Sequence, residues 1–177
     1  MKKIKIGVIG SLADKKLHPH LKTLSLHVGK EIAKQGAILL FGYEEDFDSV
    51  STIAAKNAFS LGGEVIAFVR GSQKPKNDFV QIITGQERGG GREFSLILSS
   101  DAVICLGGGS GTLMELAIAY QFNLPIVTLK NTGGWSQSLA SKYLDQRKRS
   151  KIITANSPKK AVSLAIKLAK KMIELKK

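Results

Sequence analysis

The sequence predicts an α/β protein in which helices cover both faces of a mostly parallel β-sheet. Short runs of β-branched and other apolar residues alternate with longer segments of helical periodicity, which is typical of βαβ units. Several of the short runs are apolar at consecutive positions, as expected for strands that are buried on both faces. The chain has 177 residues, no break in composition and no internal repeat. We therefore expect residues 1–177 to form a single doubly wound, Rossmann-like domain.

The same pattern predicts the individual elements. We expect strands at residues 4–9, 37–41, 64–69, 102–106, 125–129 and 152–154, and helices at residues 21–35, 50–61, 92–99, 111–122, 135–148 and 157–175. Ser157 followed by Pro158 is a typical helix start, and Gly36 and Gly62 stand where helices end. Residues 71–91 are rich in glycine, lysine and amides, and we expect them to form a lid or a loop of the site.

The composition excludes several classes of protein. Cys105 is the only cysteine, so the chain can form neither an intramolecular disulfide nor a paired-cysteine zinc site. It lies in an apolar run, and we interpret it as a small core residue. We recognise no signal peptide and no apolar stretch of about 20 residues, so we expect a cytoplasmic protein without membrane contact.

The chain is strongly basic. It has 27 Lys and Arg residues against 14 Asp and Glu residues, and residues 142–177 alone contribute +10 to the formal charge of +13. From residue 157 onward the apolar residues share one helical stripe and the lysines lie opposite, so we interpret this charge as a solvated face. Nucleic-acid binding is the weaker alternative, because aromatic residues make up only 6% of the chain and are not interleaved with the basic ones.

The clearest functional motif follows a predicted buried strand. There the chain passes through a glycine loop into a helix, and glycines let backbone N–H groups approach an anion at the positive end of the helix. We therefore predict that this loop binds the phosphate of a nucleotide-like small molecule, although glycines also serve tight strand-to-helix packing. The predicted phosphate-binding residues of the loop are Gly107, Gly108, Gly109, Ser110, Gly111 and Thr112.

The loop belongs to a longer block that resembles a known family. Arg92 and Glu115 lie 23 positions apart around Asp101 and the glycine loop. This block resembles the LOG-like, formerly "lysine decarboxylase-like", Rossmannoid proteins, in which an arginine precedes PGGxGTxxE. Gly107 replaces the proline, as in a branch with GGGxGTxxE that includes uncharacterised and molybdenum-cofactor carrier-like proteins. The first turn, with Gly10 and Ser11, also resembles that of the family.

The resemblance implies an enzyme, a nucleoside 5′-monophosphate phosphoribohydrolase. Glu115 would stabilise an oxocarbenium-like state and activate water, and Arg92 would orient it or contact the nucleotide. A structural ion pair between these two residues is the alternative. Gly10, Ser11 and Gly42 would add to the phosphate site, and a homodimer or higher homo-oligomer is expected. A pyridoxal-phosphate lysine decarboxylase is not expected, because we find no motif for the lysine that would hold that cofactor.

One departure from the family favours a different function. The second glycine motif of the family, GGGxxGxM, is reduced here to Gly42 followed by four acids within residues 44–48. Carboxylates would repel a phosphate unless Mg²⁺ lay between them, and a solvated acidic turn that caps the next helix is the alternative. A non-catalytic carrier or sensor of a nucleotide or pterin-type cofactor explains this departure. We expect no metal site at His18 and His20, which we place in a surface loop.

Overall fold

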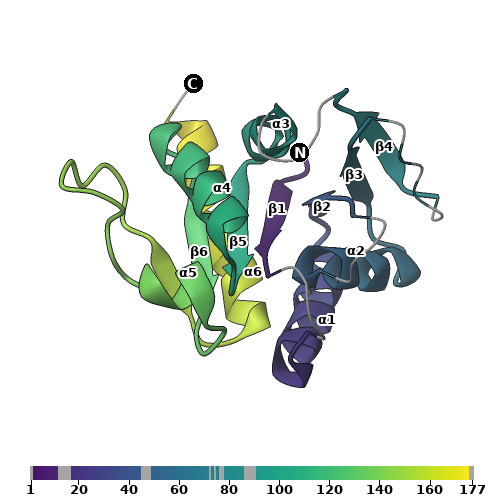
Figure 1. Ribbon diagram of the computed structural model, residues 1–177, viewed down its shortest axis with the longest axis horizontal. Coiled ribbons are helices and arrows are strands. Elements are labelled where there is room, and N and C mark those ends of the chain that lie inside the picture. The colour runs from purple at the N-terminus through teal and green to yellow at the C-terminus, as the bar shows by residue number, and fades with distance from the viewer. Residues whose placement is uncertain are drawn as a thin grey trace.

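The computed structural model describes residues 2–11, 17–44, 49–71, 73, 75, 78–85 and 91–175. These residues form one sheet of seven parallel strands in the order β4-β3-β2-β1-β5-β6-β7 (Figure 1). The strands β1 to β4 step outward in one direction, and β5 then returns to the other side of β1. This reversal between β1 and β5 is the switch point of a doubly wound sheet, so the predicted α/β class is confirmed. The strands are β1 Lys5–Gly10, β2 Ile38–Gly42, β3 Val65–Val69, β4 Val80–Ile83, β5 Ala102–Leu106, β6 Ile126–Leu129 and β7 Ile153–Ala155.

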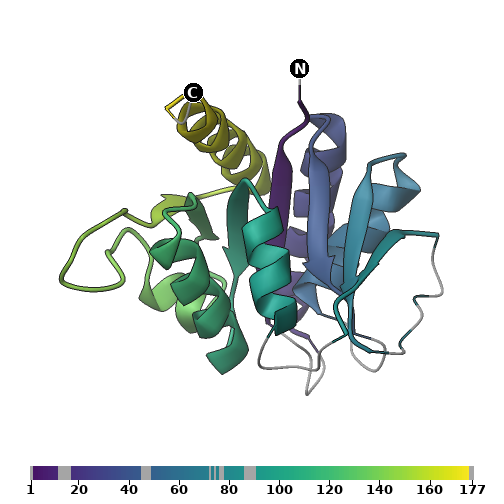
Figure 2. The ribbon, with the colours of Figure 1, turned by 90° about the horizontal axis from the view of Figure 1, so that it is seen from above.

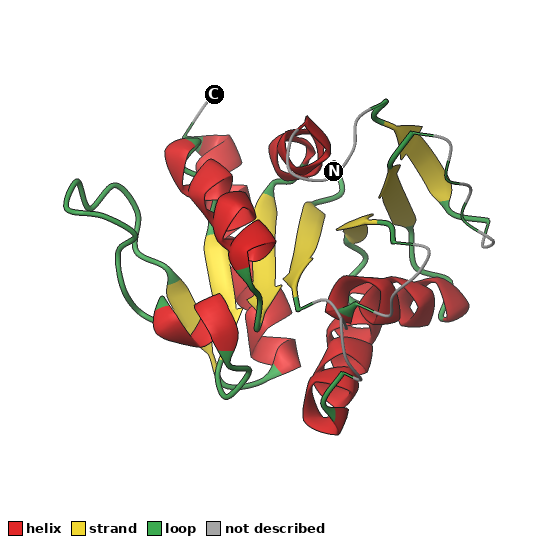
Figure 3. Cartoon of the chain, in the orientation of Figure 1, coloured by secondary structure: helices red, strands yellow, loops and turns green. Residues whose placement is uncertain are grey.

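Helices cover both faces of the sheet (Figures 1 and 3). One face packs against α1, α2 and α6, and the other packs against α3 and α4, so the sheet separates two apolar cores. The start of β1 and the end of α6 lie at the same end of the sheet (Figure 2). The helices of the described chain are α1 Pro19–Lys34, α2 Val50–Ser60, α3 Gly91–Ser99, α4 Ser110–Gln121, α5 Gly134–Ser138 and α6 Pro158–Glu174.

Local signals place most helix ends. Ser157 caps α6 by accepting a hydrogen bond from the Lys160 N–H (3.3 Å, N to Oγ), and Pro158 occupies the first helical position. Gly36 and Gly62 follow α1 and α2 with positive φ angles of 67° and 76°, as their predicted role as helix stops requires. His18 is exposed in the loop before α1, as expected, and caps the helix through Nδ1, whereas His20 is already helical.

Two expectations were wrong. Residues 71–91 contain a strand, β4, which pairs with β3; the strand was missed because all four of its residues are exposed and show no buried face. The helix expected at 135–148 ends at Ser138. Beyond it, Ser141 and Lys148 have positive φ angles of 58° and 50°, which a helix cannot accommodate. No helix of the described chain is long and apolar enough to span a membrane.

Candidate functional site

A cavity of about 300 Å³ lies at the switch point between β1 and β5, beyond the carboxyl ends of these two strands. Gly10, the last residue of β1, pairs with Leu106, the last residue of β5, so the glycine loop starts directly beside the end of β1. Open parallel sheets bind ligands at such switch points. The described lining residues are Val8, Ile9, Gly10, Gly42, Glu44, Ser49, Ser51, Arg92, Glu93, Ser110, Gly111, Thr112, Met114 and Glu115.

The N-terminus of α4 forms one wall of this cavity. Gly109 is the N-cap residue and supplies no side chain, so the first-turn N–H groups are left for another acceptor. The backbone N–H groups of Ser110, Gly111 and Thr112 donate to no acceptor within the described residues, and Ser110 and Gly111 are exposed. Three free donors at the positive end of a twelve-residue helix favour an anion, phosphate above all.

The rest of the glycine loop is held in shape by internal contacts. The Gly108 N–H donates to Ser11 Oγ (2.9 Å), and Thr112 Oγ1 donates to the Gly10 carbonyl (3.1 Å). Gly107 and Gly108 have φ angles of 67° and 105°, and a Cβ on Gly108 would lie 2.4 Å from Thr112 Cγ2. Only glycine fits there, because both the backbone conformation and the space exclude a side chain.

Arg92, which also lines the cavity, is the centre of a buried ion-pair network. Its side chain is only 8% exposed; Nη1 donates to Glu44 Oε1 (2.7 Å) and to the Tyr43 carbonyl (3.1 Å), and Nη2 donates to Glu93 Oε1 (3.1 Å). Arg70 lies 3.5 Å from the second oxygen of Glu44. The Nε of Arg92 is buried and has no hydrogen-bond partner among the residues that the structure describes. An unpaired buried donor is unfavourable, so a ligand acceptor at this point would stabilise the network.

This network corrects two expectations. Glu44 is 4% exposed and bound by arginine, so it does not belong to a solvated acidic turn; residues 45–48 lie outside the described residues. The cap of α2 is Ser49, whose Oγ accepts from the Thr52 N–H (3.0 Å), and no acid stands in the first turn of that helix. Arg92 and Glu115 line the same cavity, yet the partners of the guanidinium are Glu44 and Glu93, so the predicted ion pair with Glu115 is not formed.

Glu115 has an unusual protonation equilibrium. Burial of its carboxyl, together with the charges of Glu93 and Glu44, raises the pKa to about 8, and Arg92 acts in the opposite direction. At neutral pH the side chain is therefore mainly a neutral carboxylic acid, which both donates and accepts a hydrogen bond.

Seven of the eleven predicted site residues line the cavity: Gly10, Gly42, Arg92, Ser110, Gly111, Thr112 and Glu115. Ser11, Gly107, Gly108 and Gly109 shape the loop behind it and are not part of its lining. Gly42 lies beside the Arg92 guanidinium, and a Cβ there would lie 3.4 Å from Arg92 Cζ, an ordinary van der Waals distance. Sequence reasoning missed Glu44 and Glu93 as site residues, although both follow features that it had singled out, Gly42 and Arg92.

A model of the SLOG cluster4 family matches residues 3–162. The chain belongs to this family. A relative from Archaeoglobus fulgidus, named only as an uncharacterized protein, is 35% identical to this SLOG cluster4 protein over 131 residues, which are 73% of this chain and 82% of the relative. The predicted LOG-like kinship thus holds at the level of the family and the fold, and the placement in the GGGxGTxxE branch stays a prediction.

Solved structures similar to this SLOG cluster4 protein include two that bind a cofactor. The structural-genomics target TM1055 has a TM-score of 0.80 at 26% identity and covers 93% of this chain and 99% of its own. The molybdenum cofactor carrier protein of Chlamydomonas reinhardtii has a TM-score of 0.79 at 26% identity, over 94% and 98% of the two chains. The molybdenum cofactor binding protein of Rippkaea orientalis has a TM-score of 0.75 at 28% identity, over 94% and 98%.

Asp101 and Cys105, which the sequence analysis named, lie outside the cavity, as does Trp135. The Asp101 Oδ2 accepts from the Lys5 N–H (2.8 Å) and ties β5 to the start of β1. Cys105 is fully buried in β5, as predicted, and burial raises the pKa of its thiol far above the usual range. Trp135 packs on the core of the α3 and α4 face. No group of three or more His, Cys, Asp or Glu side chains in the described part of this SLOG cluster4 protein is placed to hold a metal ion.

Proposed function

We propose that this protein binds a phosphorylated, pterin-type cofactor of the molybdenum-cofactor kind and carries it without cleaving it. The observation that supports this function best is the similarity to two molybdenum cofactor-binding proteins over more than nine tenths of each chain. Fold alone does not decide function, so the chemistry of the cavity must also suit such a ligand.

The cavity offers two kinds of hydrogen-bond donor. The free N–H groups of Ser110, Gly111 and Thr112 suit a phosphate, and a volume of about 300 Å³ is at the lower end of the usual range for small-molecule sites. The neutral Glu115 acid and the Arg92 Nε, which has no partner among the described residues, suit the hydrogen-bonding edge of a heterocycle, because a carboxylic acid pairs with an adjacent N–H and acceptor.

The protonation of Glu115 also weighs against the hydrolase. A carboxylate that stabilises an oxocarbenium-like state has to be ionised, whereas the Glu115 carboxyl, with a pKa of about 8, is mainly neutral at pH 7. A phosphoribohydrolase remains the second candidate, because a carboxyl with a raised pKa is suited to act as a general acid. An assay for released base distinguishes the carrier from the hydrolase.

The test is to purify the protein from a bacterial host that makes the molybdenum cofactor. Molybdenum is measured by mass spectrometry and the pterin by fluorescence after oxidation. We expect up to about one equivalent of molybdenum and of pterin per protein chain. We expect neither in Gly111→Asp, which sets a carboxylate at the free N–H groups. The matched control is Gly111→Asn, of the same shape but neutral; open space surrounds this position. Absence of both molybdenum and pterin from the wild type would overturn the carrier function.

The hydrolase is tested on the same proteins prepared free of cofactor. Cofactor-free protein is incubated with AMP, GMP, CMP and UMP, and chromatography measures released base. A carrier releases none. Release that Glu115→Gln abolishes would instead establish the phosphoribohydrolase. Light scattering of the purified protein tests the predicted homo-oligomer, and repetition of the binding assay with a chelator tests the predicted role of Mg²⁺.

A further inference from the structure

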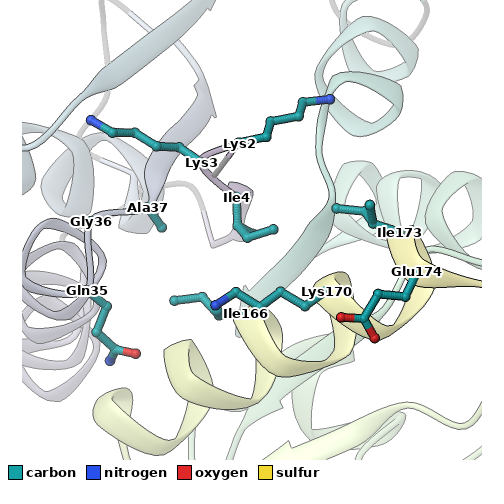
Figure 4. Close-up of a pocket in the computed structure, with 10 residues that line it drawn as sticks. All are labelled: Lys2, Lys3, Ile4, Gln35, Gly36, Ala37, Ile166, Lys170, Ile173 and Glu174. Carbon is teal, nitrogen blue, oxygen red and sulfur yellow. The ribbon is translucent and has the colours of Figure 1, made fainter. Parts of the chain in front are cut away.

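A second cavity lies at the end of the sheet opposite the candidate site. It encloses about 360 Å³ between the residues that lead into β1 and β2 and the last turns of α6. Figure 4 shows Ile4 on the β1 side facing Ile166, Lys170, Ile173 and Glu174 along α6. Isoleucine and alanine side chains form an apolar floor, and Lys2, Lys3 and Lys170 stand around it.

This cavity continues along α6. A neighbouring hollow of about 490 Å³ shares Gln35, Ile166, Lys170 and Glu174 with it and adds Lys167 and Lys171. We call the two hollows together the basic groove. Five lysines line the basic groove against one acid, Glu174. Lys3 forms an ion pair with Glu64, whereas Lys170 forms none within the described residues, so its charge is available to a partner.

We propose that the basic groove docks an acidic segment of a partner protein that carries an apolar side chain. The lysines favour a negatively charged partner, since complementary charge steers association and rejects like-charged surfaces. The half-buried Ile166 and Ile173 of the floor favour a side chain that buries hydrocarbon there. An elongated groove suits a peptide segment better than a compact small molecule.

The same features argue against nucleic acid as the occupant. A phosphate backbone can pair with lysines, but it has no apolar group for the isoleucine floor. None of the described residues that line the groove is aromatic, so bases have no ring to stack on.

The position of the groove has a consequence for any cargo. Residues that precede β1 and β2 line the basic groove, whereas residues at the carboxyl ends of these strands line the candidate site. A docked partner therefore leaves the cargo cavity open, and the two binding events can occur together. This proposal does not depend on the identity of the cargo.

The test uses cargo-free full-length protein and fluorescence anisotropy of a labelled peptide, Asp-Glu-Glu-Leu-Glu-Asp-Glu, at about physiological ionic strength, where charges more than ~8 Å apart are largely screened. We expect Lys170→Glu to weaken binding by about fivefold or more, because it replaces an attraction by a repulsion. Lys160→Glu is the matched control: the residue is exposed on the same helix, outside the groove, and should change affinity by less than about twofold. A peptide with Ala in place of Leu should also bind less tightly.

Three results would overturn the proposal. The first is that the peptide does not bind at millimolar concentration. The second is that Lys170→Glu and Lys160→Glu weaken binding equally, which would mean that only the overall charge of the protein attracts the peptide. The third is that a thymidine oligonucleotide displaces the peptide at a lower concentration than the unlabelled peptide does, which would mean that the groove prefers nucleic acid. Because no cargo is present, failure here leaves the outcome of the molybdenum and pterin measurement untouched.

Discussion

Replacement of Glu115 by glutamine should change how the stability of the protein depends on pH. The native pKa of about 8 lies above the ordinary value of 4.5, so between these pH values the unfolded chain is ionised while the native carboxyl keeps its proton. The native state then binds more protons, and its stability falls as the pH rises through this window. The two pKa values differ by about 3.5, which at about 1.4 kcal/mol for each unit gives a ceiling of about 5 kcal/mol. Partial access of water to the cavity lowers this figure.

Urea unfolding at pH values from 4.5 to 8.5 measures the effect. The free energy of unfolding of Glu115→Gln should equal that of the wild type near pH 4.5 and exceed it by several kcal/mol near pH 8, because glutamine has no proton to lose. The difference between the two proteins removes the contribution of all other titrating groups. A difference for Glu115→Gln that stays flat within about 0.5 kcal/mol across this range would refute the reasoning.

Three further predictions concern packing and reactivity. Gly29→Ala should destabilise the fold by about 1–3 kcal/mol or more in urea unfolding, because its Cβ would lie 2.0 Å from the Ala54 carbonyl oxygen where α1 crosses α2; unchanged stability would contradict this contact. Tyr120→Phe should speed tryptic cleavage within residues 141–151, because the Tyr120 hydroxyl donates to Asp145 (2.8 Å) and accepts from the N–H of residue 149 (3.0 Å); wild-type cleavage rates would exclude an anchoring role. Cys105 should react with an aromatic disulfide reagent at pH 8 only after unfolding, since burial raises the pKa of its thiol; rapid reaction of the native protein would show that it opens at β5.

The elements that sequence analysis placed well are those whose own residues carry the information. The strand predicted at 102–106 matches β5 because a parallel strand buried on both faces is apolar at every position. The exposed strand β4 has no such pattern: its pairing with β3, for example Val80 beside Ile66, defines it. The helix expected at 135–148 ends early because contacts with Tyr120, distant in sequence, hold the segment in another conformation.

The residues of the candidate site fall into the same two groups, those predictable from local sequence and those that depend on distant parts of the chain. The glycine loop could be found from its order of strand, glycines and helix, because the free N–H groups of Ser110 and Gly111 follow from that order alone. The burial of Glu44 could not be found, because it depends on Arg70 and Arg92, which β3 and α3 bring to it from elsewhere in the chain. In the sequence, Glu44 looks like a negative charge that would repel an anionic ligand. In the fold, Arg70 lies beside one of its carboxylate oxygens and Arg92 beside the other, and they neutralise it.

The net charge of the cavity changes near pH 8, where Glu115 loses its proton. Below pH 8 the described lining holds the carboxylates of Glu44 and Glu93 and the guanidinium of Arg92; above it, a third carboxylate is added. If the cargo is an anionic cofactor, its affinity should fall above pH 8, by up to about tenfold for each pH unit when binding requires the protonated acid. Equilibrium dialysis of bound pterin from pH 6.5 to 9.5 measures this, and Glu115→Gln should remove the dependence. If the wild-type affinity is constant across pH 8, the Glu115 carboxyl does not face the cargo, and this holds even if the protein does bind a cargo.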